Sequence, residues 1–531
     1  MTIHGLSLIA GKPGAPGGTT FRAINPASQE KLEPAFHEAS NAEVDYALTA
    51  AAEAFEKFRA CSGKERARFL ETIAEEIEKL GDPLLERAHG ETGLPLARLQ
   101  GERARTCGQL RLFAFVAKEG SWVDARIDPA LPDRQPAPRP DLRRCLIPLG
   151  PVVVFGSSNF PLAFSVAGGD TASAFAAGCS VVVKAHRAHP GTSEMVAGAV
   201  TRAAASCGLP PGVFSLIHGG GATIGMTMVR HPATTAVGFT GSHTAGRALF
   251  DAAVSRPRPI PVFAEMSSLN PVFLLPGALA ERGGKITQGL LASFTLGVGQ
   301  FCTKPGLIFM LKSSATDTFL ELLSEAVRSA SCGTMLTPGI REAFLANQKI
   351  ITSASEVRLL GNAQSVPDPA KTQGQPSVAV TTARNFLKTP ALGSTEAFGP
   401  FTLVIVADSP EELRDCAAAL EGQLTATVHG APSDFESAGS LLARLEQLAG
   451  RIIINGFPTG VEVCPAMNHG GPYPATTDVR YTSVGTAAML RFARPVCYQD
   501  LPDPLLPPAL QNANPLGLLR LVNGQYSSAS L

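Results

Sequence analysis

Residues 151–184, PVVVFGSSNFPLAFSVAGGDTASAFAAGCSVVVK, decide the fold class. Val152–Phe155 and Ser180–Lys184 are short runs rich in valine, typical of strands that are buried on both faces of a sheet. The alanine-rich segment between them predicts a helix from about Pro161 to Ala177. A strand, a helix and a second strand in this order predict a parallel βαβ unit.

The alternation of strands and helices continues toward the C-terminus. A further helix is predicted from about Thr192 to Cys207, and further strands are predicted at Val213–Ile217, Ala236–Phe239, Ile260–Ala264, Val272–Leu275, Leu307–Leu311, Leu403–Val406 and Ile452–Asn455. The sequence therefore predicts an α/β protein whose parallel strands are covered by helices on both faces.

The segments that flank this pattern are less regular. Residues 1–35 are rich in Gly, Pro and Thr and predict an irregular arm or hairpin, after which Asn41 is expected to cap a helix that runs to Cys61. A second helix is predicted from an apolar stripe and is expected to stop at Gly81; the stripe is Phe69, Ile73, Ile77 and Leu80. Residues 126–142 hold five prolines and predict a linker or an edge ribbon that reaches toward another subunit.

Composition narrows the class of protein. The chain has 531 residues, with 45 Lys+Arg and 45 Asp+Glu, so its formal net charge is zero and it is long enough for about three domains. A hydrophobic fraction of 45% argues against disorder, and the neutral charge argues against nucleic acid as a partner.

Neither a membrane span nor an export signal is predicted. Cys145–Gly169 contains no charged residue, but its prolines and glycines would break a spanning helix. The N-terminus has no basic segment leading into a long apolar run, so a cytoplasmic location is expected. The ten cysteines contain no CxxC pair, which argues against a zinc site, and no metal is predicted.

Three polar residues follow predicted strands or lie in turns where chemistry is often placed. Cys302 lies in the glycine-bracketed turn GQFCTKPG, Glu265 ends an apolar strand, and Asn159 follows the strand Val152–Phe155. Each has an ordinary alternative: a buried cysteine, a solvated carboxylate and a loop-capping amide. Taken singly, these residues leave the reaction open.

The combination of motifs resembles the aldehyde dehydrogenase superfamily over roughly residues 20–500. The motifs are Asn-Phe-Pro at 159–161, Phe-Thr-Gly-Ser at 239–242, Glu265, Gly-Gln-x-Cys at 299–302, Glu-x-Phe-Gly-Pro at 396–400 and Asn-Gly at 455. The resemblance implies a modified Rossmann cofactor domain (1–122 and 148–267), an α/β catalytic domain (268–466), a small β oligomerisation element (123–147 and 483–500) and a C-terminal arm (501–531). It also implies a homodimer or a homotetramer.

The resemblance implies a catalytic sequence for three residues. The thiolate of Cys302 would attack an aldehyde, the amide of Asn159 and the cysteine backbone N–H would hold the oxyanion, and Glu265 would activate the water that hydrolyses the thioester. The glutamate favours hydrolysis over acyl transfer to coenzyme A.

Cofactor binding is implied in the same way. Lys184 corresponds to the lysine at the adenosine ribose, Ser242 to the serine near the pyrophosphate, and Glu396 with Phe398 to the clamp on the nicotinamide ribose. Five more residues are expected at the cofactor: Phe155, Ser157, Gly225, Phe239 and Gly241. Arg187 stands where NAD-preferring members carry a glutamate, so NADP is predicted, with NAD as the alternative and a solvent-facing Arg187 left open.

The substrate is the least determined property. Ser267 and Ser268 replace two frequent glycines, and Thr303-Lys304-Pro305 replaces small residues, which together favour the NADP-dependent branch that acts on fatty aldehydes and on α-ketoglutarate semialdehyde (2,5-dioxopentanoate). The pocket is expected to be apolar and to contain Phe160, Phe164, Phe301, Thr303 and Phe457. We predict oxidation of 2,5-dioxopentanoate to 2-oxoglutarate, with medium- and long-chain aldehydes as the alternative. A carboxylate substrate needs an arginine or several hydroxyls, which the sequence does not place.

Two other functions stay open at this point. A cysteine hydrolase or acyltransferase without redox chemistry would need a histidine near Cys302, and no such motif surrounds it in the sequence. A non-catalytic relative is disfavoured because Cys302, Glu265 and Asn159 are all present.

Overall fold

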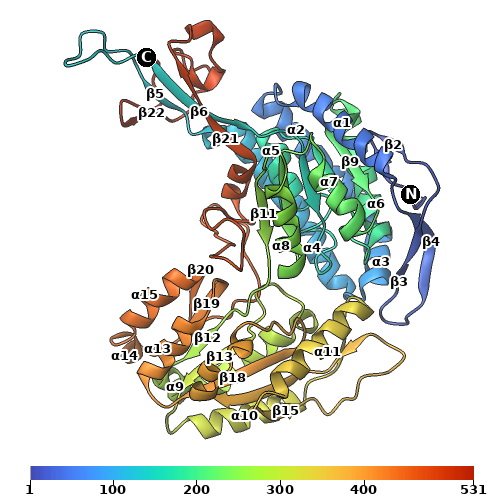
Figure 1. Cartoon of the computed structure of the whole chain (residues 1–531), viewed down its shortest axis with the longest axis vertical. Coiled ribbons are helices and arrows are strands. Elements are labelled where there is room, and N and C mark those ends of the chain that lie inside the picture. Colours follow the sequence, from blue (N-terminus) through green and yellow to red (C-terminus); the bar gives the residue numbers. More distant parts are fainter. Residues whose placement is uncertain (1) are drawn as a thin grey trace.

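The structure is a computed structural model that describes residues 2–531, and its chain forms two large sheets and a projecting ribbon (Figure 1). The first sheet has the strand order β11-β10-β7-β8-β9-β1-β2. Its strands are β7 (Val152–Phe155), β8 (Val181–Lys184), β9 (Phe214–Ile217), β10 (Ala236–Thr240), β11 (Val262–Glu265), β1 (Leu8–Ile9) and β2 (Lys12–Pro13). Strands β7 to β11 are parallel, and β1 is antiparallel to β9. The predicted α/β class is confirmed.

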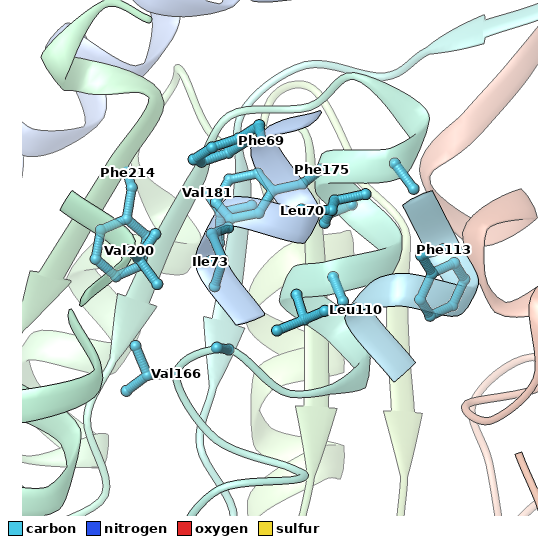
Figure 2. Close-up of a cluster of buried hydrophobic side chains, with 14 of the residues drawn as sticks. Phe69, Leu70, Ile73, Leu110, Phe113, Val166, Phe175, Val181, Val200 and Phe214 are labelled. Carbon is cyan, nitrogen blue, oxygen red and sulfur yellow. The ribbon is translucent and has the colours of Figure 1, made fainter. Parts of the chain in front are cut away.

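Helices cover both faces of the first sheet. They are α1 (Asn41–Phe58), α2 (Gly63–Glu78), α3 (Gly81–Thr92), α4 (Leu96–Glu119), α5 (Gly169–Ala177), α6 (Pro190–Ser206), α7 (Met226–Arg230) and α8 (His243–Val254). Figure 2 shows one of the two cores, in which Phe69, Phe175 and Phe214 pack beside Val181. Val152 and Val154 enter this core, whereas Val153 enters the core on the other face, as the alternation of a strand requires.

Several local expectations near the first sheet were wrong. Ser40, and not Asn41, caps α1, because its hydroxyl accepts from the N–H of Glu43 while the Glu43 carboxylate accepts from the Ser40 N–H. Helix α2 ends at Glu78, and Gly81 begins α3. The helix expected from Pro161 begins only at Gly169, because residues 161–168 form turns in which the Gly169 N–H donates to the Ala163 carbonyl.

The second sheet has the strand order β15-β17-β18-β13-β12-β19-β20. Its strands are β12 (Val272–Leu274), β13 (Leu307–Leu311), β15 (Arg358–Asn362), β17 (Ser377–Thr382), β18 (Phe401–Ala407), β19 (Gln423–His429) and β20 (Ala449–Ile454). All neighbouring pairs are parallel except β15 with β17. Its helices are α9 (Pro276–Thr295), α10 (Thr316–Arg328), α11 (Pro338–Thr352), α12 (Ala383–Lys388), α13 (Pro410–Ala419), α14 (Pro432–Phe435) and α15 (Gly439–Leu448).

A five-stranded sheet forms the ribbon that projects at the top of Figure 1. Its strands, in spatial order, are β21 (Ala493–Gln499), β6 (Leu142–Pro148), β5 (Arg126–Asp128), β22 (Arg520–Val522) and β23 (Gln525–Ser527). The tail after Pro502 is therefore not a separate arm, because β22 pairs with β5 and the tail's Leu510 and Leu518 are buried against the ribbon.

Two further sheets have two strands each. The hairpin of β3 (Thr20–Ile24) and β4 (Lys31–His37) lies near the N-terminus, and β14 (Gly333–Thr334) pairs with β16 (Gln373–Gly374). Among residues 2–531, no helix has the length and apolar character needed to cross a membrane.

Candidate active site

Cys302 lies in a turn that two glycines shape. Gly297 and Gly299 have φ values of 55° and 67°, in the left-handed region that favours glycine. A Cβ on Gly299 would lie 2.2 Å from the carbonyl oxygen of Gly399, so the cysteine turn packs directly on the segment that carries Glu396. The turn exposes the half-buried Cys302 thiol before the chain enters β13.

Asn270 fixes the backbone of this turn. Its side-chain amide donates to the carbonyls of Cys302 at 2.9 Å and Lys304 at 3.1 Å. The Ser268 hydroxyl bonds to the Asn270 side chain and to Gln423, so the serine that replaces a glycine ties the segment after β11 to β19. Asn270 was not predicted from the sequence. Only the folded structure, which places the segment after β11 beside the cysteine turn, shows its role.

Glu265 is the last residue of β11 and is hydrogen-bonded to two side chains from a distant segment. The Nε2 atom of His469 lies 3.0 Å from Glu265 Oε1, and the Ser483 hydroxyl donates to Oε2. Burial acts to raise the pKa of Glu265, but the hydrogen bonds and charge interactions outweigh it, so the pKa lies below its usual value. The carboxylate form is favoured.

The Cys302 thiol lies beside the same two groups. Its Sγ is 3.3 Å from His469 Nε2. Burial and the negative charge of Glu265 raise the pKa of Cys302 well above its usual value, while the charges of Arg105 and Arg451 act in the opposite direction. These pKa directions favour a neutral Cys302 thiol beside an ionised Glu265 carboxylate.

His469 is a functional candidate that sequence reasoning missed, and it bears on the hydrolase alternative. In a nucleophile–histidine–acid triad, opposite ring nitrogens contact the nucleophile and the acid. Here Nε2 contacts both Cys302 and Glu265, and Nδ1 is buried without a hydrogen-bond partner in the described residues 2–531. The ring is therefore not arranged as in a hydrolase triad.

The same three side chains are close enough to share a metal ion. One ligand atom from each of Glu265, Cys302 and His469 lies within 4.8 Å of the others. The hydrogen bonds between these groups account for the arrangement without an ion.

Asn159, which follows β7 of the first sheet, bonds to the cysteine turn and lines the same cavity as Cys302. Its side-chain nitrogen donates to the carbonyl of Gln300 at 3.0 Å, which leaves the second N–H of the amide free of that bond. Arg98 holds its backbone by donating to the Asn159 carbonyl at 2.7 Å. An oxyanion donor can therefore be positioned beside Cys302.

A cavity of about 700 Å³ joins these groups. It brings together eight of the predicted site residues, namely Ser157, Asn159, Gly241, Ser242, Glu265, Cys302, Glu396 and Phe398. The predicted cofactor residues outside its lining are Phe155, Lys184, Arg187, Gly225 and Phe239.

Phe155 and Phe239 shape one side of the candidate dinucleotide site. Their rings are 6.0 Å apart, edge to face. A Cβ on Gly225 would lie 2.8 Å from the Phe155 ring, and a Cβ on Gly241 would lie 2.6 Å from the Phe239 ring. Ser242 caps α8, so the N-terminus of this helix meets the cavity where a pyrophosphate can accept hydrogen bonds.

Lys184 and Arg187 lie at and beyond the end of β8. Burial lowers the pKa of Lys184 to about 8. Arg187 forms an ion pair with Glu38 and its guanidinium lies 4.8 Å from the centre of the Phe21 ring. The arginine is half-exposed, but it already has an acidic partner, which the sequence did not indicate.

Glu396 lies on the opposite wall, where burial raises its pKa and Lys304 and Ser267 act to lower it. Lys304 is buried, and its Nζ donates to the carbonyls of Ala397 and Phe401. Burial lowers the pKa of Lys304 to about 8. This lysine joins the cysteine turn to the Glu396 segment.

The predicted substrate residues divide into two groups. Phe160 packs edge to face against Phe164 and Phe301, at 5.3 Å in each case, next to Asn159 and Cys302. Phe457 packs on His429, and Thr303 is buried with 1% exposure. Ring contacts therefore join three of the five residues, namely Phe160, Phe164 and Phe301.

Comparisons with known proteins all match aldehyde dehydrogenases. The model of the aldehyde dehydrogenase family matches residues 14–481. The chain is 51% identical over 526 residues to α-ketoglutaric semialdehyde dehydrogenase 2 of Azospirillum brasilense, covering 99% of this chain and 100% of the relative. It is 48% identical over 530 residues to α-ketoglutaric semialdehyde dehydrogenase of Acinetobacter baylyi, covering 98% of each.

Solved structures show the same fold at lower identity. A point mutant of betaine aldehyde dehydrogenase from Staphylococcus aureus in complex with NAD+ matches with a TM-score of 0.79 and 20% identity, over 94% of this chain and 98% of that one. A 3,6-anhydro-L-galactose dehydrogenase in complex with NADP matches with a TM-score of 0.79 and 22% identity, over 93% and 99%.

Proposed function

The chain belongs to the aldehyde dehydrogenase family, and we propose that it oxidises 2,5-dioxopentanoate to 2-oxoglutarate through a thioester on Cys302. The observation that carries this proposal is the convergence of Cys302, Glu265 and Asn159 on one cavity. The two relatives of about 50% identity, both named for α-ketoglutaric semialdehyde, support the substrate.

The first chemical step follows from the contacts of the thiol. The Cys302 thiol loses its proton to solvent, and its sulfur bonds to the aldehyde carbon. The free N–H of the Asn159 amide and the backbone N–H of Cys302 donate to the resulting oxyanion. His469 and Ser483 hold the Glu265 carboxylate in place for the later hydrolytic step.

Ser242 and Glu396 would hold NAD(P)+, which would supply the hydride acceptor that converts the adduct on Cys302 to a thioester. Glu265 then accepts a proton from water, whose oxygen attacks the thioester carbon. The C–S bond breaks, and the products are the carboxylate and the Cys302 thiol. One aldehyde, one water and one NAD(P)+ would therefore give one carboxylate, one NAD(P)H and two protons.

NADP is the proposed preferred cofactor, with NAD as the alternative. The half-exposed Arg187 and the nearby Lys184 can bind a 2′-phosphate by charge-assisted hydrogen bonds. Glu38 opposes this preference, since its carboxylate repels the phosphate and can accept from a ribose 2′-hydroxyl. We therefore propose an enzyme that uses both cofactors and prefers NADP.

We propose a role for each of the three parts of the chain. The first sheet would hold the cofactor, the second sheet would carry the cysteine turn, and the ribbon would join subunits into a homodimer or homotetramer. The last strands of the tail would belong to the joining element, because β22 pairs with β5. A cytoplasmic location and a small aldehyde as the partner complete the proposal.

The decisive assay compares 2,5-dioxopentanoate, pentanal and decanal with NAD and with NADP. We expect the highest kcat/KM for 2,5-dioxopentanoate with NADP. A higher kcat/KM for decanal would favour an aliphatic aldehyde dehydrogenase instead. Activity that persists in Cys302→Ala would contradict the catalytic role of the thiol.

A further inference from the structure

Arg105, on helix α4, is a cation that is stacked on the aromatic residues beside the nucleophile and has unused donors. Its guanidinium lies 5.8 Å from the centre of the Phe160 ring and 5.4 Å from that of Phe164. Within residues 2–531, its Nε and Nη2 atoms are buried and have no hydrogen-bond partner. The side chain is ordered by the rings and leaves donors to be satisfied by another group.

Two other arginines, Arg98 and Arg451, use their N–H groups to bind backbone carbonyls. Arg98 donates from Nη2 to the carbonyl of Asn159, and Arg451 donates from Nη1 and Nη2 to the carbonyls of Gly460 and Pro458. These two side chains stabilise the loops whose carbonyls accept from them. Arg105 leaves two nitrogens, Nε and Nη2, buried without a partner in residues 2–531, whereas Arg451 leaves only Nε.

The nearest acidic residue on the helix does not neutralise Arg105 directly. Glu102, one turn earlier, uses Oε1 to accept from the N–H groups of Leu162 and Ala163. Its Oε2 is buried without a partner within residues 2–531, and burial raises the pKa of this carboxyl. A guanidinium that is buried without a paired anion is costly, so its presence beside a reactive thiol points to an anionic ligand.

The position of Arg105 relative to Cys302 suits a short substrate. Phe160 follows Asn159 in the chain and packs at 5.3 Å on Phe301, the residue before Cys302. The Phe160 and Phe301 rings therefore separate Arg105 from Cys302, and the charge of Arg105 acts to lower the pKa of Cys302. In 2,5-dioxopentanoate, four bonds separate the aldehyde carbon from the carboxylate carbon, a span of about 5 Å.

We propose that Arg105 binds the carboxylate of the 2-oxo acid end of the substrate and thereby selects an oxo-acid semialdehyde over a neutral aldehyde. The inference rests on the proposed function, which left the recognition of the carboxylate unassigned. The Phe160 and Phe164 rings cover the guanidinium, and its unused N–H groups form paired hydrogen bonds to the two carboxylate oxygens. The same rings contact the two methylene groups between the aldehyde and the oxo acid.

A different role for Arg105 would be to stabilise the Cys302 thiolate by its charge. The two roles predict different kinetics. Loss of a carboxylate partner raises KM for acidic substrates alone, whereas loss of a charge beside the thiolate lowers kcat for every aldehyde and moves the pH profile of Cys302 alkylation upward.

The test measures kcat and KM for 2,5-dioxopentanoate and pentanal in wild type, Arg105→Met and Arg105→Lys. For Arg105→Met we expect kcat/KM for 2,5-dioxopentanoate to fall about 100-fold, while that for pentanal changes by less than about threefold. Arg105→Lys should show an intermediate loss, since lysine keeps the charge but not the paired donors. Arg103→Met is the matched control, because Arg103 lies on the same helix and donates to the Gly81 carbonyl.

The outcomes separate this inference from the proposed function. If the wild type does not oxidise 2,5-dioxopentanoate but oxidises pentanal, the proposed substrate is wrong. If the wild type prefers 2,5-dioxopentanoate and Arg105→Met keeps that preference, Arg105 is not the carboxylate partner. An equal loss of kcat for both substrates would also overturn the inference and assign Arg105 to the thiolate.

Binding can be measured without turnover, in case the methionine variant folds poorly. Glutarate should slow the alkylation of Cys302 by iodoacetamide in wild type and in Arg103→Met, and it should slow this reaction much less in Arg105→Lys. Equal protection of all three proteins would contradict the proposal.

Discussion

Glu38 and Arg187 form an ion pair beyond the carboxyl end of the central strand β8, between the residue that follows β4 and the loop that follows β8. The pair is asymmetric in exposure, because the Arg187 side chain is 49% exposed and that of Glu38 is 16% exposed. A 2′-phosphate on the cofactor would have to compete with Glu38 for the same guanidinium. The carboxylate of Glu38 is therefore expected to limit the preference for NADP.

Removal of this competition should change cofactor choice. In Glu38→Gln, we expect the ratio of kcat/KM for NADP to that for NAD to rise about tenfold, because the amide no longer repels the phosphate. In Arg187→Glu, the ratio should fall about 100-fold. Steady-state kinetics with both cofactors measure these ratios. Unchanged ratios in both variants would place the ribose elsewhere.

Glu265→Gln should separate the two halves of the reaction. The variant keeps hydrogen-bonding atoms toward His469 and Ser483 but cannot accept a proton from water. We expect a fast burst of reduced cofactor followed by turnover that is about 100-fold slower than in wild type. Mass spectrometry of the acid-quenched protein should find the acyl group on Cys302. Wild-type steady-state turnover in this variant would exclude Glu265 as the base.

The pH dependence of Cys302 alkylation follows from the direction of its pKa. Burial and Glu265 raise this pKa, so the rate of reaction with iodoacetamide should still be rising above pH 9 in the protein without ligands. In Glu265→Gln, the negative charge is absent and the profile should move to lower pH. A profile that moves upward would contradict the electrostatic coupling between the two residues.

The raised pKa of Cys302 also predicts a trend in stability. The folded-state pKa lies above the unfolded value, so the neutral thiol contributes stability below the unfolded value, and this contribution is lost as the pH rises through the folded value. The fall in Tm above pH 9 should therefore be smaller in Cys302→Ala than in wild type. An equal fall would mean that the thiol is not stabilised in its neutral form.

Gly299→Ala should damage both the turn and the activity. Alanine is strained at φ 67°, and its Cβ would approach the Gly399 carbonyl oxygen to 2.2 Å. We expect a loss of at least about 3 kcal/mol in the free energy of unfolding, measured by urea denaturation, together with loss of turnover. The matched control is Gly108→Ala on α4, where a Cβ meets no atom within 4 Å and a slight stabilisation is expected.

The sequence predicted the fold where local pattern and tertiary environment agree. The valine runs of β7 and β8 are buried on both faces, so their composition and their structure coincide. The helix expected from Pro161 was too long. Residues 161–168, which follow Asn159, form turns, and the helix begins only at Gly169. Tertiary contacts, such as the bond from the Gly169 N–H to the Ala163 carbonyl, decided that boundary.

Site residues that follow strands could be predicted from the sequence, whereas those that arrive from distant segments could not. Glu265 could be found because it ends an apolar strand. His469 is 167 residues from Cys302 in the chain and reaches it through folding alone, although the Gly470-Gly471 pair after it resembles the glycines around Cys302. Arg105 was missed because its helix was not predicted, and on a helix with many charged residues a single arginine carries no distinguishing pattern.

The pairing of β22 with β5 joins two strands that are almost 400 residues apart in the chain. During synthesis, both large sheets can therefore form while the edge of β5 is still unpaired. A chain that stops early would keep this open edge, which invites aggregation with other unpaired strands. By pairing with β5, β22 thus protects the ribbon from pairing with a second chain.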